Sequence, residues 1–176
     1  MHAPARLIAA IRDWQAAVPP PVVIAIDGHG AAGKTTLATE VATTLDAVVL
    51  HTDDYFHAAA ATCDPQPMAP YYDWGRLRDG ALAEALAGAS APILVEGVSA
   101  AAPALADLIT HTVFVATPEP VRLARLRSRI PPDEWDEDWL AAERVYFDGR
   151  PPESFDLIVS GSPESPDTAW TPRIVG

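Results

Sequence analysis

The sequence has little of what marks secreted, membrane-embedded or nucleic-acid-binding proteins. Cys63 is the single cysteine in 176 residues, so no disulfide forms within the chain. No apolar run approaches the roughly 18 residues of a membrane span, and the N-terminus lacks the basic-then-apolar pattern of a secretory signal. We therefore expect a cytoplasmic protein with no membrane partner.

Basic residues are also scarce. The chain carries 12 Lys and Arg against 24 Asp and Glu, a formal net charge of −12. Broad nucleic-acid binding depends on a basic surface, so we expect no nucleic-acid partner. The length of 176 residues predicts one domain over residues 1–176, large enough for a substantial core.

Lysine is the scarcest charged residue, because Lys34 is the only one and every other basic side chain is Arg. Lys34 lies in a segment that matches G-x-x-x-x-G-K-[ST], the P-loop that cradles nucleotide phosphates. A slim ammonium fits between the β- and γ-phosphates, where a planar guanidinium would not. The predicted nucleotide-binding residues are Gly28, His29, Gly30, Ala31, Ala32, Gly33, Lys34, Thr35 and Thr36.

The flanking sequence supports this interpretation. Residues 22–27 form a short apolar, β-branched run typical of a buried parallel strand. Residues 36–45 have apolar positions at helical spacing. A strand, a glycine-rich turn and a helix would direct backbone N–H groups and the helix dipole at phosphate. The Thr35 hydroxyl would be a ligand of Mg²⁺.

The remainder of the chain alternates between the two element types. Helices are expected over 4–17, 74–88, 103–109, 118–130 and 135–148, strands over 47–51, 92–96, 111–116 and 156–160, and a Pro-rich loop over 57–72. This alternation predicts an α/β three-layer sandwich of the P-loop NTPase type, with a parallel five-stranded sheet and helices on both faces.

Carboxylates follow two of these strands, at the sheet edge where ligands bind. We interpret Asp53 as the base that orients and deprotonates an acceptor hydroxyl, although Asp also favours caps and turns. Glu96 ends an apolar strand, where an unpaired carboxylate would be costly. Asp53 and Glu96 are therefore candidate Mg²⁺ ligands together with Thr35, directly or through water. A zinc site at His51, Asp53 and His57 is disfavoured, since no further ligands accompany them.

Arg122, Arg125 and Arg129 share one face of the expected helix 118–130. One interpretation is a solvated basic face paired with the acidic residues of 133–138. The favoured one is a helical lid whose arginines clamp phosphates during transfer, with Arg125 and Arg129 as the candidate catalytic residues beside Lys34 and Asp53.

In order, these elements resemble the uridine kinase family of P-loop nucleoside and small-molecule kinases. The likeness covers the P-loop, the segment from Thr52 to Phe56, the Tyr72-Asp73-Trp74 element, the Glu96-Gly97 strand end and the lid arginines. The resemblance implies an ATP- and Mg²⁺-dependent phosphotransferase. It also implies that Asp53 is the catalytic carboxylate and that Asp73, in the Tyr72-Asp73-Trp74 element, holds the ribose hydroxyls of the acceptor. Tyr72 and Trp74 either stack on a base or sugar of the acceptor or pack beside the Pro-rich loop.

The sequence departs from the family in the region expected to contact the acceptor. Only residues 74–95 lie where uridine kinases carry a longer segment with a base-reading hairpin, and the Arg-Gly-Arg segment after the lid is replaced by 131–135. A nucleoside such as uridine or cytidine is the leading acceptor. A sugar, a pantothenate-like compound or a vitamin alcohol is the alternative, and a non-catalytic ATP- or GTP-binding regulator is a third.

Overall fold

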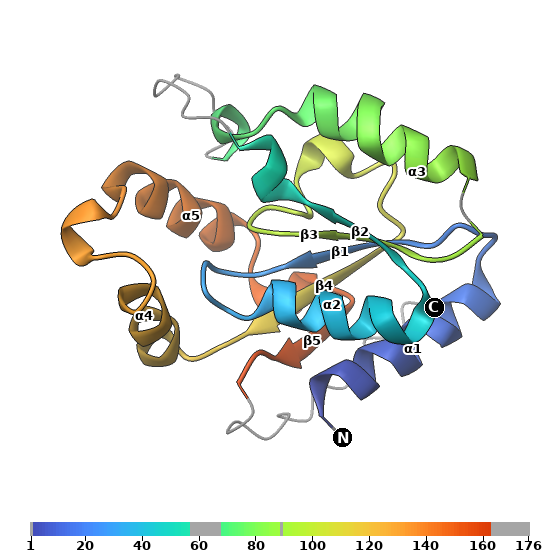
Figure 1. The fold of residues 1–176 in the computed structure, drawn as a ribbon, viewed down its shortest axis with the longest axis horizontal. Helices are drawn as coiled ribbons and strands as arrows, with labels where there is room; N and C mark the ends of the chain where they lie inside the picture. Colours follow the sequence, from blue (N-terminus) through green and yellow to red (C-terminus); the bar gives the residue numbers. More distant parts are fainter. Residues whose placement is uncertain (1, 57–67, 89, 163–176) are drawn as a thin grey trace.

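A computed structural model describes residues 2–56, 68–88 and 90–162 (Figure 1). Residues 57–67 of the expected Pro-rich loop lie outside this part. The strands form one parallel sheet in the order β2-β3-β1-β4-β5. Their bounds are β1 Val23–Asp27, β2 Val48–His51, β3 Ile93–Glu96, β4 His111–Ala116 and β5 Leu157–Ser160. The predicted five-stranded parallel sheet is thus confirmed.

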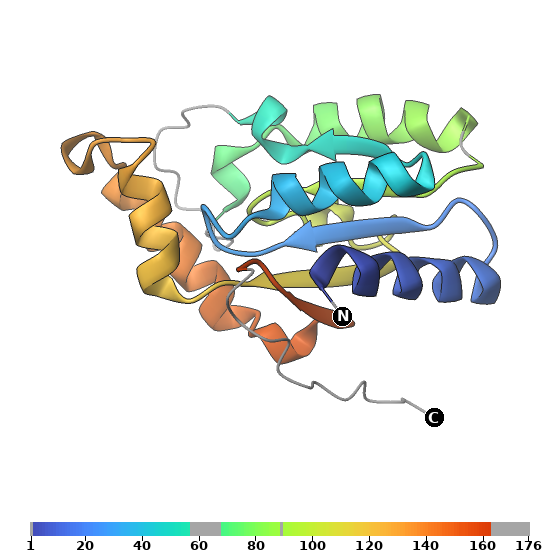
Figure 2. The same cartoon turned by 60° about the horizontal axis from the view of Figure 1, so that its bottom comes forward.

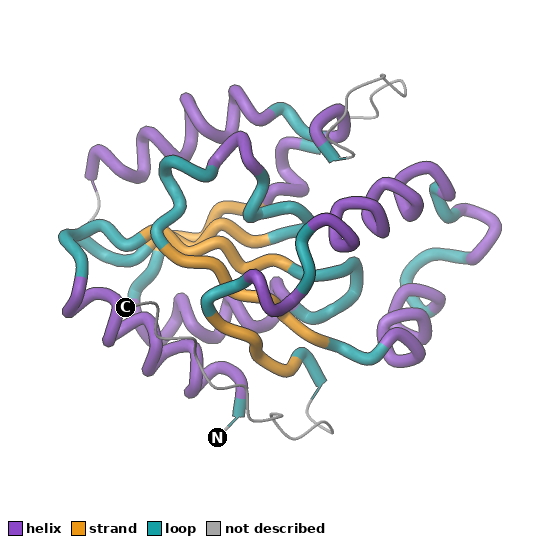
Figure 3. Tube along the Cα trace, turned by 180° about the vertical axis from the view of Figure 1, so that it is seen from behind, coloured by secondary structure: helices purple, strands orange, loops and turns teal. Residues whose placement is uncertain are grey.

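Helices cover both faces of the sheet (Figures 2 and 3). On one face, α1 (Ala3–Ala17) and α2 (Lys34–Leu45) bury Leu7, Ile11, Leu37 and Val41 against the strands. On the other face lies a helix that winds as a π-helix over Arg76–Leu82 and continues as α3 (Ala83–Gly88). This face also contains aromatic residues from near the end of the chain. The result is the three-layer α/β sandwich expected from the sequence.

An arm extends beyond the carboxyl ends of the strands (Figure 1). It consists of α4 (Glu119–Arg127), a 3₁₀ turn at Pro132–Glu134, and α5 (Glu137–Gly149). Pro131 and Pro132 separate the helices because neither can supply a backbone N–H to an extended α4. The C-terminal part of α5 returns to the core, where Phe147 is buried.

One expected helix is shorter than predicted. Residues 103–109 form only a 3₁₀ turn at Pro103–Leu105. The chain leaves the turn early because Thr110 already donates its backbone N–H to the Val23 carbonyl, 2.9 Å away, as the chain enters β4. Within the described ranges, none of the helices combines the length and the apolarity needed to cross a membrane.

Candidate active site

The glycine-rich turn connects the end of β1 to the start of α2. Gly28 has φ +145°, and a Cβ there would lie 2.8 Å from the Val115 carbonyl oxygen, so the turn needs glycine at this position. The Lys34 ammonium donates to the carbonyls of Gly28 (2.7 Å) and His29 (2.9 Å). Burial lowers the pKa of Lys34, while the charges of Asp27 and Glu96 act in the opposite direction. The lysine therefore sits inside the turn, at the place expected for a phosphate-binding cation.

Asp27, the last residue of β1, holds the start of the glycine-rich turn in place. Its carboxylate accepts hydrogen bonds from the backbone N–H groups of Gly28, Ser99 and Ala101 and from the Tyr146 hydroxyl, at 2.7–3.1 Å. Burial raises the pKa of Asp27, and the hydrogen bonds from Tyr146 and the amides oppose that shift. Sequence reasoning gave Asp27 no role, although a carboxylate ending a wholly apolar strand was a usable signal.

Thr35 and Glu96 meet where α2 begins and β3 ends. The Thr35 hydroxyl donates to Glu96 Oε1 over 3.0 Å, and His51 Nδ1 lies 2.6 Å from the same oxygen. Only 4% of Glu96 is exposed. A hydroxyl and a carboxylate held together fit Mg²⁺, a hard cation that uses few protein ligands and retains water. Asp53 is near enough to Lys34 and Glu96 for both charges to influence its pKa.

Asp53 is exposed and lies in a 3₁₀ turn, Thr52–Tyr55, directly after β2. Surrounding protein atoms raise the pKa of Asp53, and the Lys34 ammonium counteracts that effect. The Phe56 backbone pairs with Tyr72 as an isolated antiparallel bridge, and the Asp73 N–H donates to the Tyr55 carbonyl. This pairing brings the Tyr72 segment beside Asp53.

The three residues predicted to contact the acceptor occupy different environments. Tyr72 is buried but still reaches the cavity described below. Trp74 packs against it with ring centroids 5.0 Å apart. The Asp73 carboxylate accepts from the Arg76 N–H over 3.0 Å, as a helix-capping residue does. Of these three residues, Tyr72 is therefore the one that lines the cavity.

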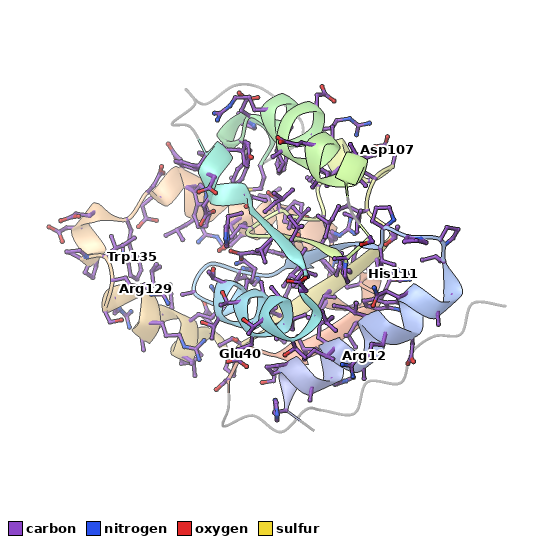
Figure 4. All side chains as sticks on the ribbon, turned by 45° about the vertical axis from the view of Figure 1, so that its right-hand side comes forward. Arg12, Glu40, Asp107, His111, Arg129 and Trp135 are labelled. Atoms are coloured by element: carbon purple, nitrogen blue, oxygen red, sulfur yellow. The ribbon has the colours of Figure 1, made fainter. Side chains whose placement is uncertain are left out.

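The arginines of α4 and its C-terminal end point in different directions. Arg125 donates to the carbonyls of Ala31, Ala32 and Gly161, at 3.0–3.3 Å, and so braces the outside of the turn. Arg122 donates to the Gly30 carbonyl over 3.2 Å. Arg129 is exposed on the arm, as is visible beside Trp135 (Figure 4). Among the arginines of this segment, Arg122 contacts the turn from the cavity side.

Glu143 is a site residue that sequence reasoning missed. It comes from α5, is 3% exposed, and accepts a hydrogen bond of 2.5 Å from the Gly30 N–H. Its second oxygen lies 3.3 Å from His29 Nδ1, and the His29 ring packs on Phe147. Burial acts to raise the pKa of Glu143, but His29, the Gly30 amide and Arg122 outweigh it and lower the pKa. The helical spacing of α5 gave no sign of this contact, which joins residues 113 positions apart.

One cavity of about 640 Å³ adjoins these groups. His29 and Gly30 of the turn line one side, and Asp53, Phe56 and Tyr72 line a second. The arm supplies the third side. Its lining residues are Glu119, Arg122, Leu123, Leu126, Ile130, Glu134, Trp135, Asp136, Glu137, Trp139, Leu140, Glu143 and Arg144. A volume of this size accommodates a small-molecule ligand.

Comparison with known proteins identifies the fold. No protein-family model matches the sequence, and comparison with curated proteins finds no match. Among solved structures, a possible uridine kinase from Bacillus stearothermophilus aligns with a TM-score of 0.60 at 19% identity, over 88% of this chain and 98% of its own.

Two further kinases are similar. A candidate fructose transport system kinase from Silicibacter sp. TM1040 aligns with a TM-score of 0.53 at 19% identity, over 90% of this chain and 99% of its own. A sugar kinase from Janibacter sp. HTCC2649 aligns with a TM-score of 0.51 at 19% identity, over 81% of this chain and 86% of its own. The predicted resemblance to uridine kinase-like and other P-loop kinases is confirmed in the fold.

Proposed function

We propose that this chain is a phosphotransferase that moves the γ-phosphate of Mg·ATP to a hydroxyl group of a small molecule. The observation that carries the proposal is the shared cavity, which the glycine-rich turn and Asp53 line together. Transfer requires a phosphate donor and an acceptor hydroxyl to meet beside a proton acceptor. The names of the aligned structures, which are kinases for different small molecules, support the same class of reaction.

On the donor side, the turn and the N-terminus of α2 would hold the phosphates through backbone N–H groups. The Lys34 ammonium, which now bonds two carbonyls of the turn, would neutralise charge on the transferred group. Thr35 and Glu96, with Asp53 nearby, would hold Mg²⁺, which supplies further charge neutralisation when bound.

On the acceptor side, Asp53 would accept the proton of the attacking hydroxyl. The new bond joins the acceptor oxygen to the γ-phosphorus, and the bond from that phosphorus to the β-phosphate oxygen breaks, leaving ADP. A carboxylate whose pKa is raised is a stronger base than an ordinary one. Arg122 is the arm residue best placed to meet phosphate, because it already contacts Gly30. Arg125 and Arg129 remain candidates for the same role.

Several finer expectations remain part of this proposal. They are a single domain over 1–176, a cytoplasmic location, ATP as the donor, and a nucleoside such as uridine or cytidine as the acceptor. A sugar, a pantothenate-like compound or a vitamin alcohol is the alternative acceptor, supported by the sugar and fructose kinases among the aligned structures. A nucleotide-binding regulator would have no use for Asp53 at the cavity.

The test is ADP release from Mg·ATP with a panel of nucleosides, sugars and vitamin alcohols, with Lys34→Ala as the blank. We expect at least one acceptor to raise ADP release well above the rate with water alone. Bound ATP without acceptor-dependent release from any compound would favour the regulator.

A further inference from the structure

The charge of the cavity lining bears on the kind of acceptor it takes. Two guanidinium groups line it, from Arg122 and Arg144, against six carboxylates. The carboxylates belong to Asp53, Glu119, Glu134, Asp136, Glu137 and Glu143. Arg122 is itself engaged with the Gly30 carbonyl and influences Glu143. The cavity therefore has an excess of negative charge before any nucleotide adds its own.

This excess is only partly offset, by Lys34 near Asp53 and by His29 and Arg122 near Glu143. Within residues 2–56, 68–88 and 90–162, no Lys or Arg forms an ion pair with any of the six carboxylates. Glu143 and Asp136 have other partners, the Gly30 amide and the Trp139 amide that Asp136 caps. Glu119, Glu134 and Glu137 are exposed at the cavity.

The apolar part of the lining suits a cation equally well. Phe56, Tyr72, Trp135 and Trp139 present aromatic rings around the same volume. The faces of such rings attract ammonium groups, and the attraction increases where the group is shielded from water. Arg127 already lies over the Trp135 ring, 5.9 Å from its centroid, which shows that this ring accepts a cationic neighbour.

We propose that the acceptor is a positively charged hydroxylated molecule, an amino alcohol or amino sugar whose protonated amine lies among the arm carboxylates and aromatic rings. The inference rests on the proposed function, because it assigns the acceptor of that same cavity. A hydroxy acid would meet a net excess of like charge. A neutral polyol would gain no attraction from the exposed carboxylates, which would stay hydrated. The amine would lie away from the transferred phosphate, and the reacting hydroxyl would face Asp53.

Acidic residues in the first turn of α5 also have a structural explanation, since they complement the helix dipole. Asp138 shares that turn but does not line the cavity, and neither does Asp133. A dipole role would make Asp138 equivalent to Glu137. A role in ligand binding would separate them, and this difference provides a matched control.

The experiment measures binding and turnover together with two sets of compounds that share a scaffold and differ in charge. The sets are glucosamine, glucose and glucuronate, and tyramine, tyrosol and 4-hydroxyphenylacetate. Calorimetry on the full chain with Mg·ADP should give tighter binding of the cation in at least one set, by about tenfold over the neutral compound at low salt. That preference should shrink as salt screens the carboxylates. Equal affinities, preference for the anion, or no binding of either cation would overturn the proposal.

Two double variants test which carboxylates cause the cation preference. Glu134→Gln combined with Glu137→Gln should reduce the cation preference by about threefold to tenfold. Asp133→Asn combined with Asp138→Asn, which removes the same charge from the same segment, should leave it unchanged. Equal losses in both variants would show general surface charge and contradict the assignment.

The same samples are assayed for ADP release from Mg·ATP. Cation preference without release would count against the phosphotransferase and support the charge assignment. ADP release that increases with the neutral or anionic compound, and not with the cation, would support the phosphotransferase and count against the charge assignment.

Discussion

The glycine-rich turn and the arm formed by α4 and α5 face the same cavity, but they are held in place by different means. The turn rests on buried groups, with Asp27 bonded by three amides and Tyr146, and Lys34 bonded by two carbonyls. The cavity-facing acids of the arm are mostly exposed and make few contacts. The groups proposed to act on phosphate thus lie on a base held by buried hydrogen bonds, while the surface proposed to contact the acceptor is held by few.

Removing the cation of the turn should have the largest effect. Lys34→Ala should lower turnover by about 10³-fold, because no other lysine exists to neutralise the transferred phosphate. Lys34→Arg should not restore it, since the broader group does not fit the same space. Steady-state ADP release measures both variants, with circular dichroism to establish folding. Full activity of Lys34→Arg would contradict the steric argument.

Replacing Asp53, the proposed general base, should have the second largest effect on turnover. Asp53→Asn should lower acceptor-dependent kcat by about 10²-fold and change the affinity for Mg·ATP far less, because the main proposed role of Asp53 is on the hydroxyl. Asp54→Asn is the matched control, as an exposed neighbour that does not line the cavity. Equal turnover in Asp53→Asn would eliminate Asp53 as the base.

The pH dependence of kcat/KM tests the same role of Asp53. Surrounding protein atoms partly desolvate Asp53 and raise its pKa above the ordinary 3.8, so the base becomes available only as pH rises through that higher value. The acid limb of kcat/KM in the wild type should therefore lie above pH 3.8. The limb should be missing from the Asp53→Asn profile, and its persistence there would assign it to another group.

Replacing Asp27, which supports the glycine-rich turn, should lower the free energy of unfolding. Asp27→Asn puts an amide N–H₂ toward groups that already donate, and should lower the free energy of unfolding by about 1–3 kcal/mol. Tyr146→Phe removes only one of the four hydrogen bonds and should cost less. Urea unfolding compares the two. A larger loss in Tyr146→Phe would mean that α5 is anchored mainly through its hydroxyl.

Replacing Glu143, which joins α5 to the glycine-rich turn at Gly30, should have the smallest effect on stability. Glu143→Gln keeps an acceptor for the Gly30 N–H but loses the charge, a change of about 1 kcal/mol in the free energy of unfolding. Hydrogen bonds and nearby positive charge lower the pKa of Glu143 in the folded chain. Its contribution is therefore complete above the ordinary value of 4.5 and is lost as pH falls through the folded value. Unfolding measured across pH should show the wild type and the variant converging in acid.

The same contrast explains what the sequence could predict. The P-loop, the five strands and Glu96 follow from local patterns, because each depends on neighbours in the chain or on a strand end. Glu143 and Tyr146 contact the turn across more than 100 residues, and no local spacing records such contacts. Of the three arginines predicted to share a face, Arg129 lies beyond the end of α4. Arg125 braces the outside of the turn because the carbonyls of Ala31, Ala32 and Gly161 lie within its reach.

The most direct test of the account follows the phosphate itself. The wild-type chain is incubated with ATP labelled at the γ-phosphate, Mg²⁺ and the acceptor that gives the highest ADP release, and the products are separated. The account predicts label in a phosphate ester of the acceptor, in amounts equal to the ADP formed, and about a hundredfold less with Asp53→Asn on the same timescale. Label found only as inorganic phosphate would show that water is the acceptor and would contradict the account.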